Sequence, residues 1–232
     1  MQFLQNANLS FKVNEIFKSI QGESTYAGLP CVFIRLTGCN LRCSYCDTRY
    51  AYDEGADMTI CEIIKKIETL NAPIIELTGG EPLLQENIIF LINAVIDWQE
   101  ENKHKFSGIA PKLLIETSGS ISIKDINKKA VIIMDIKTPS SGMNERMLPD
   151  NINYLKHDDE IKFVIGSIED YEYSKKIIFD KKLYEKSKIL FSSVFGQIKP
   201  ETIIELMLKD KVPARFQLQM HKYIWPPELR GV

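Results

Sequence analysis

Short apolar runs alternate with amphipathic segments along most of the chain. Seven of these runs have the length and the apolar character of strands, whereas the segments between them repeat their apolar residues at helical spacing. The strand-like runs are apolar at nearly every position, which is typical of parallel strands covered by helices. The predicted strands are 31–37, 74–78, 112–117, 131–136, 160–165, 187–192 and 214–219, preceded by one near 11–17.

The amphipathic segments predict a helix after most of these strands. Thr59 and Glu62 have the spacing of a capping box, which marks the start of the first helix. A complete eight-unit barrel typically takes about 250 residues, and this chain of 232 residues has about seven units. We therefore expect an α/β fold built as a partial, open parallel (β/α) barrel. The predicted helices are 60–70, 85–103, 168–182 and 200–210, with a shorter one near 122–128.

The pattern indicates a single domain across residues 1–232. Residues 1–30 are predicted as an N-terminal extension, residues 31–219 as the partial barrel and residues 220–232 as a C-terminal tail. The polar stretch 138–153 contains Pro and Gly, and it is predicted as a loop inside the domain rather than a linker between domains.

Residues suited to binding and catalysis follow directly after the predicted strands. The carboxyl ends of parallel strands meet at one face of a barrel, and such folds place their active sites there. We therefore expect one site that gathers these residues. They are Gly38-Cys39, Thr78-Gly-Gly-Glu81, Thr117-Ser118-Gly119, Asp135–Lys137, Ser192-Ser193 and Gln219–His221.

Charge and hydropathy limit the classes of molecule that this site is expected to bind. The formal net charge is −2, from 29 basic and 31 acidic residues that are interspersed. Without a basic stripe, a small or buried substrate is favoured over nucleic acid. No apolar run approaches the ~20 residues of a membrane helix, and the N-terminus lacks the features of a signal peptide. We therefore expect a cytoplasmic protein that does not enter a membrane and whose cysteines are reduced.

Three of the five cysteines lie close together, with the spacing C-x3-C-x2-C at positions 39, 43 and 46. Thiolates suit soft metals, both zinc and iron–sulfur clusters. A structural zinc site needs four ligands, usually as two separated pairs, and no second pair follows here. A zinc knuckle completed by Cys31, Asp47 or a histidine remains the alternative. For Cys31 and Cys61 we expect the ordinary role of a small buried apolar residue.

The cysteine segment resembles the signature of the radical S-adenosylmethionine superfamily, C-x3-C-x-aromatic-C, with Tyr45 as the aromatic residue. Thr78-Gly-Gly-Glu-Pro82, after the next strand, is similar to the GGE motif of the same superfamily. The resemblance implies that Cys39, Cys43 and Cys46 hold a 4Fe–4S cluster. It also implies that Gly80 and Glu81 hold the methionine end of S-adenosylmethionine and that Tyr45 contacts its adenine. Ser118, Asp135, Lys137 and Ser193 are the further expected contacts to this cofactor.

More motifs point to one family within the superfamily. Residues 15–24, 33–39, 46–48, 139–143 and 219–222 all resemble the 7-carboxy-7-deazaguanine synthase family. The resemblance implies a carbon–nitrogen lyase that converts 6-carboxy-5,6,7,8-tetrahydropterin to 7-carboxy-7-deazaguanine with loss of ammonia, in the biosynthesis of queuosine and other 7-deazapurines. It implies that a hydrogen removed from C6 is later returned, so that S-adenosylmethionine is regenerated. A homodimer and an electron donor such as flavodoxin or ferredoxin are also implied.

The family resemblance assigns the residues of the pterin site and a magnesium ligand. Glu23 can accept the adjacent N–H donors of a 2-amino-4-oxopyrimidine edge, and Arg35 offers a fork for a carboxylate. Thr48 resembles the magnesium ligand, and a hydroxyl suits that hard cation. The residues expected to line the pterin site are Gln21, Gly22, Glu23, Arg35, Thr78 and His221.

Ordinary structural roles remain open for several of these residues. Residues 21–23 can be a polar turn, Thr48 can cap a turn and His221 can be a satisfied core histidine. A charge in an apolar strand is costly without a partner, so Arg35 is expected to have a partner or a ligand. His104 and His157 lie in charged surroundings and are expected to be solvated.

Two rival functions share the cysteine spacing. An activating enzyme that installs a glycyl radical on a partner protein would have the same cysteines but would need neither magnesium nor the pair formed by residues 21–23 and His221. A zinc-binding interaction module is the rival from another class. Colour separates the two kinds of metal site, because an anaerobically purified iron–sulfur protein is brown and a zinc protein is colourless.

Overall fold

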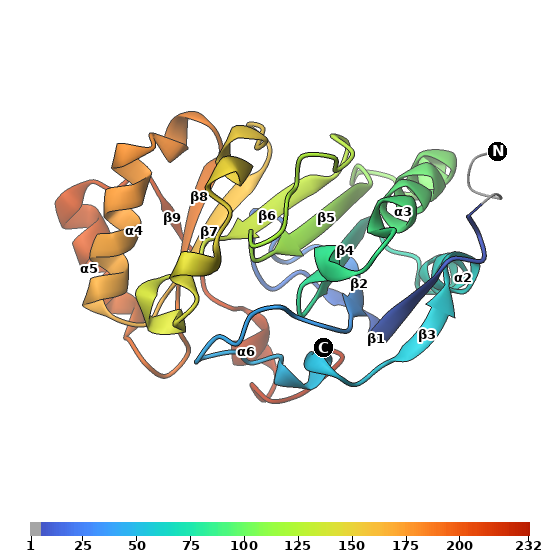
Figure 1. The fold of residues 1–232 in the computed structure, drawn as a ribbon, viewed down its shortest axis with the longest axis horizontal. Coiled ribbons are helices and arrows are strands. Elements are labelled where there is room, and N and C mark those ends of the chain that lie inside the picture. The colour runs from blue at the N-terminus through green and yellow to red at the C-terminus, as the bar shows by residue number, and fades with distance from the viewer. Residues whose placement is uncertain (1–5) are drawn as a thin grey trace.

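The computed structural model describes residues 6–232. One nine-stranded sheet runs through this part of the chain in the order β3-β1-β2-β4-β5-β6-β7-β8-β9, and Figure 1 shows it curved between two groups of helices. The strands are β1 (Ser10–Ile20), β2 (Pro30–Leu36), β3 (Ala56–Thr59), β4 (Ile74–Gly79), β5 (Lys112–Thr117), β6 (Val131–Asp135), β7 (Glu160–Ile165), β8 (Lys188–Ser193) and β9 (Arg215–Phe216).

α2 and α3 pack on the outer face of one end of the sheet, and α4 and α5 pack on that face at the other end (Figure 1). α2 and α3 follow β3 and β4, while α4 and α5 follow β7 and β8. Except for α6, these are the long helices that the sequence predicted. The helices are α2 (Ile60–Leu70), α3 (Ile88–Asn102), α4 (Ile168–Asp180), α5 (Pro200–Asp210) and α6 (His221–Ile224).

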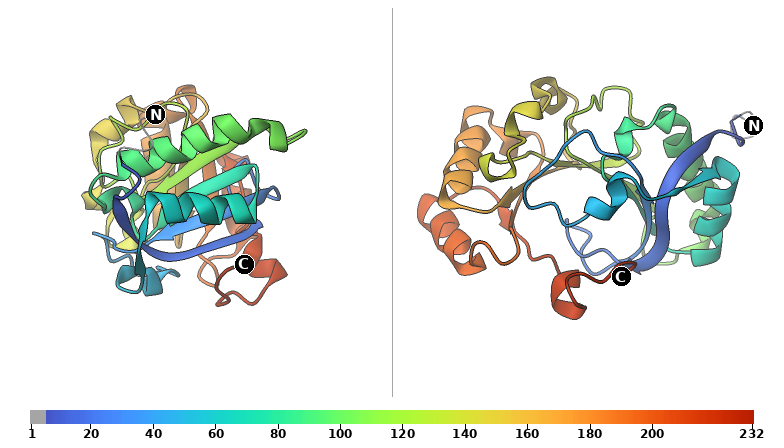
Figure 2. Two further views of the ribbon diagram at one scale, coloured as in Figure 1. Left: turned by 90° about the vertical axis from the view of Figure 1, so that its right-hand side faces the viewer. Right: turned by 60° about the horizontal axis from the view of Figure 1, so that its bottom comes forward.

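The sheet is parallel from β2 to β9, and only β1 pairs antiparallel, with β2 and β3. β3 and β9 are the two edges, so within the described residues the sheet forms an open arc rather than a closed barrel. The right-hand view of Figure 2 shows this arc with the helices outside it and the loop after β2 lying across its interior. The expected α/β fold with a partial, open parallel barrel is confirmed.

Alternation along the strands divides their side chains between two layers. The outward layer packs against the helices in one large apolar core. At the amino ends of β2, β4, β5 and β6 the inward layer is apolar, and Cys31, Phe33, Ile74, Leu114, Val131 and Ile133 form a second cluster there. Towards the carboxyl ends the inward positions become polar and charged, and this change positions the functional site.

Local sequence signals explain where the helices begin. Thr59 and Glu62 form the predicted capping box at the start of α2. The Ser167 side chain accepts from the Asp170 N–H at the start of α4, and Pro200 occupies the first turn of α5, where its missing N–H costs nothing.

Two predicted elements are wrong in extent or type. Residues 122–128 form turns rather than a helix. Side chains there satisfy the backbone instead: the Ser122 hydroxyl accepts from the Lys124 N–H, and Asn151 accepts from the Ile123 N–H. The strand predicted at 214–219 pairs only over Arg215–Phe216, because the residues after it turn away to contact the N-terminal segment. In the described part of the chain, no helix has the length and apolar character needed to span a membrane.

Candidate active site

A cavity of 760 Å³ opens at the carboxyl ends of the parallel strands. This volume lies in the usual range for sites that bind small molecules. The strand ends form its interior, while the loop after β2 and the C-terminal segment 227–232 form its mouth. Of the predicted site residues, those lining the cavity are Gln21, Gly22, Glu23, Arg35, Cys39, Cys43, Tyr45, Cys46, Thr48, Thr78, Gly80, Ser118, Asp135, Lys137 and His221.

The three cysteines of the loop after β2, here called the cluster-loop cysteines (Cys39, Cys43 and Cys46), are free thiols at one end of this cavity. The Leu41 N–H donates to the Cys39 Sγ at 3.4 Å, and burial raises the pKa of the Cys39 thiol. The loop can approach β4 closely because Gly80 has no side chain: a Cβ there would lie 2.3 Å from the carbonyl oxygen of Gly38. The glycine after β4 therefore shapes the cysteine loop.

These thiols fit an iron–sulfur cluster by their chemistry and placement. Three soft donors come from one loop and face one cavity, and such clusters are held by cysteine thiolates. Among residues 6–232, no three His, Cys, Asp or Glu side chains are grouped so that they could hold a single metal ion. A single zinc ion needs donors that converge to about 2.3 Å from one point, whereas a cluster takes one thiolate on each iron it anchors.

Glu81 and Ser193 are the two predicted cofactor contacts that do not line the cavity. Glu81 is fully buried, and its carboxylate accepts from the Leu83 N–H at 3.1 Å, the Thr117 hydroxyl at 2.8 Å and the Ser118 N–H at 2.8 Å. It therefore fixes the loop after β5 from behind the cavity. At the end of β8, strand alternation places Ser192, rather than Ser193, on the inward face.

Tyr45, Asp135 and Lys137 line the cavity near the cysteines. Burial raises the pKa of Tyr45 to about 12, and its hydroxyl lies 3.4 Å from the Thr138 hydroxyl. Lys137 Nζ contacts Asp135 Oδ2 at 2.7 Å. The other carboxylate oxygen of Asp135 is buried without a partner among residues 6–232. A buried acceptor of this kind is suited to a donor on a bound molecule.

Glu23 also lines the cavity, and its carboxylate is held from three directions. Its carboxylate accepts from Gln219 Nε2 at 2.9 Å and Gln217 Nε2 at 3.3 Å, and it contacts Lys162 Nζ at 3.1 Å. The Met220 N–H also donates to the Gly22 carbonyl at 2.9 Å. The loop 21–23 is therefore tied to the segment after β9 and is not a free polar turn.

His221 lies directly against Gly22. A Cβ on Gly22 would lie 2.5 Å from His221 Nδ1, so a larger residue at position 22 would require the imidazole to move. Burial lowers the pKa of His221, although the nearby Glu23 carboxylate acts in the other direction. The ring is thus favoured in its neutral form, with one donor and one acceptor nitrogen.

Arg35 has a protein partner and also faces the cavity. Its Nε donates to Glu15 Oε1 at 2.8 Å, and the Tyr50 hydroxyl donates to the same oxygen at 3.1 Å. Within residues 6–232, no acceptor is assigned to the terminal guanidinium nitrogens, and Arg35 lines the cavity. The ion pair satisfies one edge of the guanidinium and leaves its terminal nitrogens for a ligand.

Three charged residues that line the cavity were missed from the sequence: Glu76 and Lys162, which are buried, and Glu116, which is partly exposed. Lys162 contacts the carboxylates of both Glu116 and Glu23, and Thr78 donates to Glu116 Oε2 at 3.0 Å. Burial alone would raise the pKa of Glu116, but Lys162 outweighs it and lowers that pKa. The available signal was the one used for Arg35, a charge inside an apolar strand.

The mouth of the cavity carries a second group of charges. Lys222 Nζ contacts Asp47 Oδ2 at 2.6 Å, and the Thr48 hydroxyl donates to Asp47 Oδ1 at 3.0 Å. Burial would raise the pKa of Asp47, but Lys222 outweighs it and lowers this pKa to about 2.

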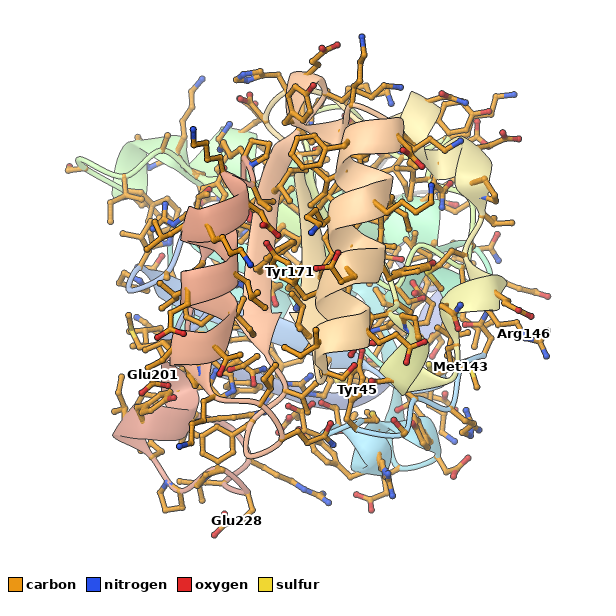
Figure 3. All side chains as sticks on the ribbon, turned by 90° about the vertical axis from the view of Figure 1, so that its left-hand side faces the viewer. Tyr45, Met143, Arg146, Tyr171, Glu201 and Glu228 are labelled. Atoms are coloured by element: carbon orange, nitrogen blue, oxygen red, sulfur yellow. The ribbon has the colours of Figure 1, made fainter. Side chains whose placement is uncertain are left out.

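The C-terminal segment joins the cysteine loop at this mouth. The Arg230 guanidinium lies 3.8 Å from the centre of the Tyr50 ring, and it contacts Glu54 at 3.0 Å. Figure 3 shows Tyr45 and Glu228 at the same lower end of the molecule, below α4 and α5, and both residues line the cavity.

The remaining cysteines and histidines lie apart from this site. Cys31 is fully buried, as expected, but Cys61 is exposed on the first turn of α2, so the expectation that it is buried is wrong. The apolar face of α2 is formed by Ile60, Ile63, Ile64 and Ile67, and position 61 falls on the opposite face. His104 and His157 are exposed, as expected.

Comparison with known proteins places this site in a family. A sequence model of the Radical SAM superfamily matches residues 33–128, the segment that holds the cluster-loop cysteines and the GGE motif. The crystal structure of QueE from Escherichia coli matches with a TM-score of 0.75 over 95% of this chain and 99% of that one. Its sequence identity is 20%, so this likeness shows the fold alone.

Curated relatives are similar over nearly the whole length of both chains. The 7-carboxy-7-deazaguanine synthase of Chlorobaculum tepidum is 43% identical over 95% of this chain and 96% of its own. Those of Clostridium acetobutylicum and Koribacter versatilis are 39% and 37% identical, and each is covered over 100% of its length. Such identity across the cysteine loop, the barrel and the segment after β9 excludes a chance match of one motif. The chain therefore belongs to the 7-carboxy-7-deazaguanine synthase family, within the radical S-adenosylmethionine superfamily.

Proposed function

We propose that this chain is a radical S-adenosylmethionine lyase that converts 6-carboxy-5,6,7,8-tetrahydropterin to 7-carboxy-7-deazaguanine with loss of ammonia, in the pathway to queuosine. One observation carries this proposal. A single cavity brings three cysteine thiols together with a carboxylate, a guanidinium and an imidazole suited to a carboxylated pterin. The two rival functions do not need this second set of residues.

The cysteine end of the cavity is the proposed cofactor site. The cluster-loop cysteines would hold a 4Fe–4S cluster, which supplies the electron that cleaves S-adenosylmethionine. Gly80, Ser118, Tyr45, Asp135 and Lys137 line the cavity near this loop. The unpartnered Asp135 oxygen is suited to a hydroxyl or ammonium donor of the cofactor. Glu81 supports this end by fixing the position of Ser118.

The part of the cavity lined by Glu23, Arg35 and His221 is the proposed pterin site. Glu23 accepts the paired N–H donors of the 2-amino-4-oxopyrimidine edge, and the contacts with Lys162, Gln217 and Gln219 hold its carboxylate in place. The terminal nitrogens of Arg35 bind the substrate carboxylate by charge-assisted hydrogen bonds. The neutral His221 ring packs against Gly22 and closes this part of the cavity.

Magnesium is proposed at the mouth of the cavity. The Thr48 hydroxyl lines the cavity and lies beside the Asp47 carboxylate, so two oxygen donors of the kind that Mg²⁺ prefers lie together. Because Mg²⁺ is usually held by few protein groups plus substrate oxygens, we infer that the ion binds together with the substrate. We also propose a cytoplasmic homodimer that receives electrons from flavodoxin or ferredoxin.

The test is anaerobic incubation of the reconstituted protein with the carboxytetrahydropterin, S-adenosylmethionine, Mg²⁺ and a chemical reductant, followed by mass analysis. We expect 7-carboxy-7-deazaguanine from the parent protein and none from the Cys43→Ala variant. Recovery of unchanged pterin from cluster-loaded protein would overturn the proposal. Colourless protein that retains zinc would instead support the interaction module.

A further inference from the structure

Glu76 is a buried acid in the centre of the cavity wall that neither the motifs nor the proposed mechanism uses. It lies in the middle of β4, on the inward face, and is 3% exposed. Its side chain lines the cavity. Its register partners in the sheet are Phe33 on β2 and Leu114 on β5. Burying a carboxylate in such a place is costly unless it is paired or protonated.

The one hydrogen bond assigned to Glu76 comes from Gln21. The Glu23 N–H donates to Gln21 Oε1 at 2.9 Å, which fixes the orientation of the Gln21 amide. The amide NH₂ group therefore faces Glu76 and donates to its Oε2. This oxygen acts as an acceptor, and the other oxygen of Glu76 is left for the cavity.

Glu76 also differs from the other acids around it in having no cation in contact. Within the described residues, Glu23 and Glu116 contact Lys162, and Glu15 contacts Arg35. The charged and titratable groups that face Glu76 are Glu116 on β5, Lys162 on β7, Glu23 in the loop after β1, and Arg35 and Cys31 on β2.

The balance of these groups favours the neutral acid. Burial, followed by the negative charge of Glu116, raises the pKa of Glu76 well above its usual value, and the positive charges of Lys162 and Arg35 do not offset this. A protonated carboxyl has one O–H donor in addition to its acceptors. Since Glu76 Oε2 accepts from Gln21, the proton can lie on Oε1, and its O–H can point into the cavity.

We propose that Glu76 is a specificity-determining residue whose carboxylic acid donates a hydrogen bond to the 4-oxo oxygen of the bound pterin. This inference rests on the proposed function, because it places a pterin in the cavity. The pyrimidine edge of that ligand presents two adjacent N–H donors and, beside them, a carbonyl acceptor. Glu23 would bind the two donors and Glu76 the acceptor, and the Gln21 amide links the Glu76 carboxyl to the backbone N–H of Glu23.

The test compares two substitutions in the reconstituted holoenzyme with S-adenosylmethionine bound. Glu76→Gln keeps the shape and the donor and acceptor pattern of a neutral acid, whereas Glu76→Leu removes both. For the carboxytetrahydropterin we expect a Kd within about threefold of the parent for the Gln variant and about ten- to a hundredfold weaker for the Leu variant. Iron content and circular dichroism show that each variant is folded and loaded.

Different results overturn different parts of the account. A Gln variant that binds as weakly as the Leu variant would mean that Glu76 acts as an anion, and a Leu variant that binds as tightly as the parent would mean that Glu76 does not contact the ligand. Either result overturns the inference and leaves the proposed function intact. A parent protein that does not bind the pterin overturns both.

Thermal stability tests the protonation of Glu76 without any substrate. A carboxyl whose pKa is higher in the folded than in the unfolded state lowers stability as pH rises above the unfolded pKa. Glu76→Gln removes this loss, so we expect its apparent Tm to exceed the parent's by about 3 °C or more at pH 8 and by less at pH 5.5, at one scan rate. Glu116→Gln is the matched control and should be less stable at pH 8, because the pKa of Glu116 is lowered by Lys162. A Glu76→Gln variant that is also less stable at pH 8 would overturn the inference.

Discussion

Arg35 offers the sharpest test of how the cavity recognises a carboxylate. Its Nε is already used by Glu15, so only the terminal nitrogens remain for a ligand. Arg35→Lys keeps the positive charge but replaces the planar fork by a compact ammonium, which cannot make two parallel hydrogen bonds. The variant therefore separates charge from geometry at one position.

The expected loss follows from the bonds that the lysine cannot make. Losing one charge-assisted hydrogen bond costs about 1.5–3 kcal/mol, which is about ten- to a hundredfold in affinity. The side chain is 16% exposed, so bulk water replaces the lost bond only poorly. We expect KM for the pterin to rise by that factor. Arg35 does not contact the cluster-loop cysteines, so cluster content and the reductive cleavage of S-adenosylmethionine under strong reductant should persist.

The assay measures 5′-deoxyadenosine and the deazapurine product together across substrate concentrations. Glu15→Gln is the matched control, because its amide oxygen still accepts from Arg35 Nε at the place where the carboxylate did. We expect this control to change KM by less than about tenfold, since it exchanges one charged hydrogen bond for a neutral one.

An equal rise of KM for the pterin in Arg35→Lys and Glu15→Gln would refute a role of Arg35 in binding the substrate carboxylate. In that case Arg35 would serve only its ion pair with Glu15, and the carboxylate of the substrate would have to bind elsewhere. Loss of the cluster in Arg35→Lys would mean that the residue supports the fold of the cavity.

Three further predictions follow from the same cavity. Replacing any one of the cluster-loop cysteines by alanine should abolish iron loading, whereas Cys31→Ser and Cys61→Ser should keep it, and iron analysis of the reconstituted variants decides. Activity should depend on Mg²⁺, and Thr48→Ala should need more of it, so identical titration curves for variant and parent would leave Thr48 as a turn residue. Lys162→Met leaves the partly exposed carboxylates of Glu23 and Glu116 without their cation and should cost about 1–3 kcal/mol of unfolding free energy at pH 7. Because Glu116 has a lowered pKa in the fold, this cost should shrink as the pH falls below about 4.5, and a cost that does not change with pH in urea unfolding would contradict it.

The strands and long helices could be predicted because their signals are local. The apolar runs of β4 and β5 and the capping box at Thr59 act within one element, and the structure has these elements within a few residues of the prediction. The helix predicted at 122–128 is absent because the backbone there is satisfied partly by the side chain of Asn151, 28 positions away from Ile123, and this contact has no local signal in the sequence.

The cavity was predicted only in part because its assembly depends on distant contacts. Strand order explains why residues after β2, β4, β5 and β6 meet at one end. The contact of Glu23 with Gln219, 196 positions away, has no signature in periodicity or spacing. The choice of Ser193 over Ser192 depended on which face of β8 is inward, and that register is set by pairing with β7.

Charged residues inside apolar strands are a signal that the sequence offers at more positions than Arg35. Arg35 was singled out as a charge inside an apolar strand, and the same argument applies to Glu76, Glu116 and Lys162. Which of these charges neutralise one another depends on distances across the interior of the arc. Lys162 on β7 reaches both Glu116 on β5 and the loop after β1, a set of contacts that only the fold defines.

The proposed lyase acts on a carboxylated pterin in this cavity and regenerates its S-adenosylmethionine. The most direct measurement is the stoichiometry of an anaerobic reaction with limiting S-adenosylmethionine, in which product, ammonia and 5′-deoxyadenosine are quantified together. We expect equal amounts of 7-carboxy-7-deazaguanine and ammonia, both in several-fold excess over the S-adenosylmethionine consumed. Accumulation of 5′-deoxyadenosine without any new heterocycle and without ammonia would contradict the proposed reaction.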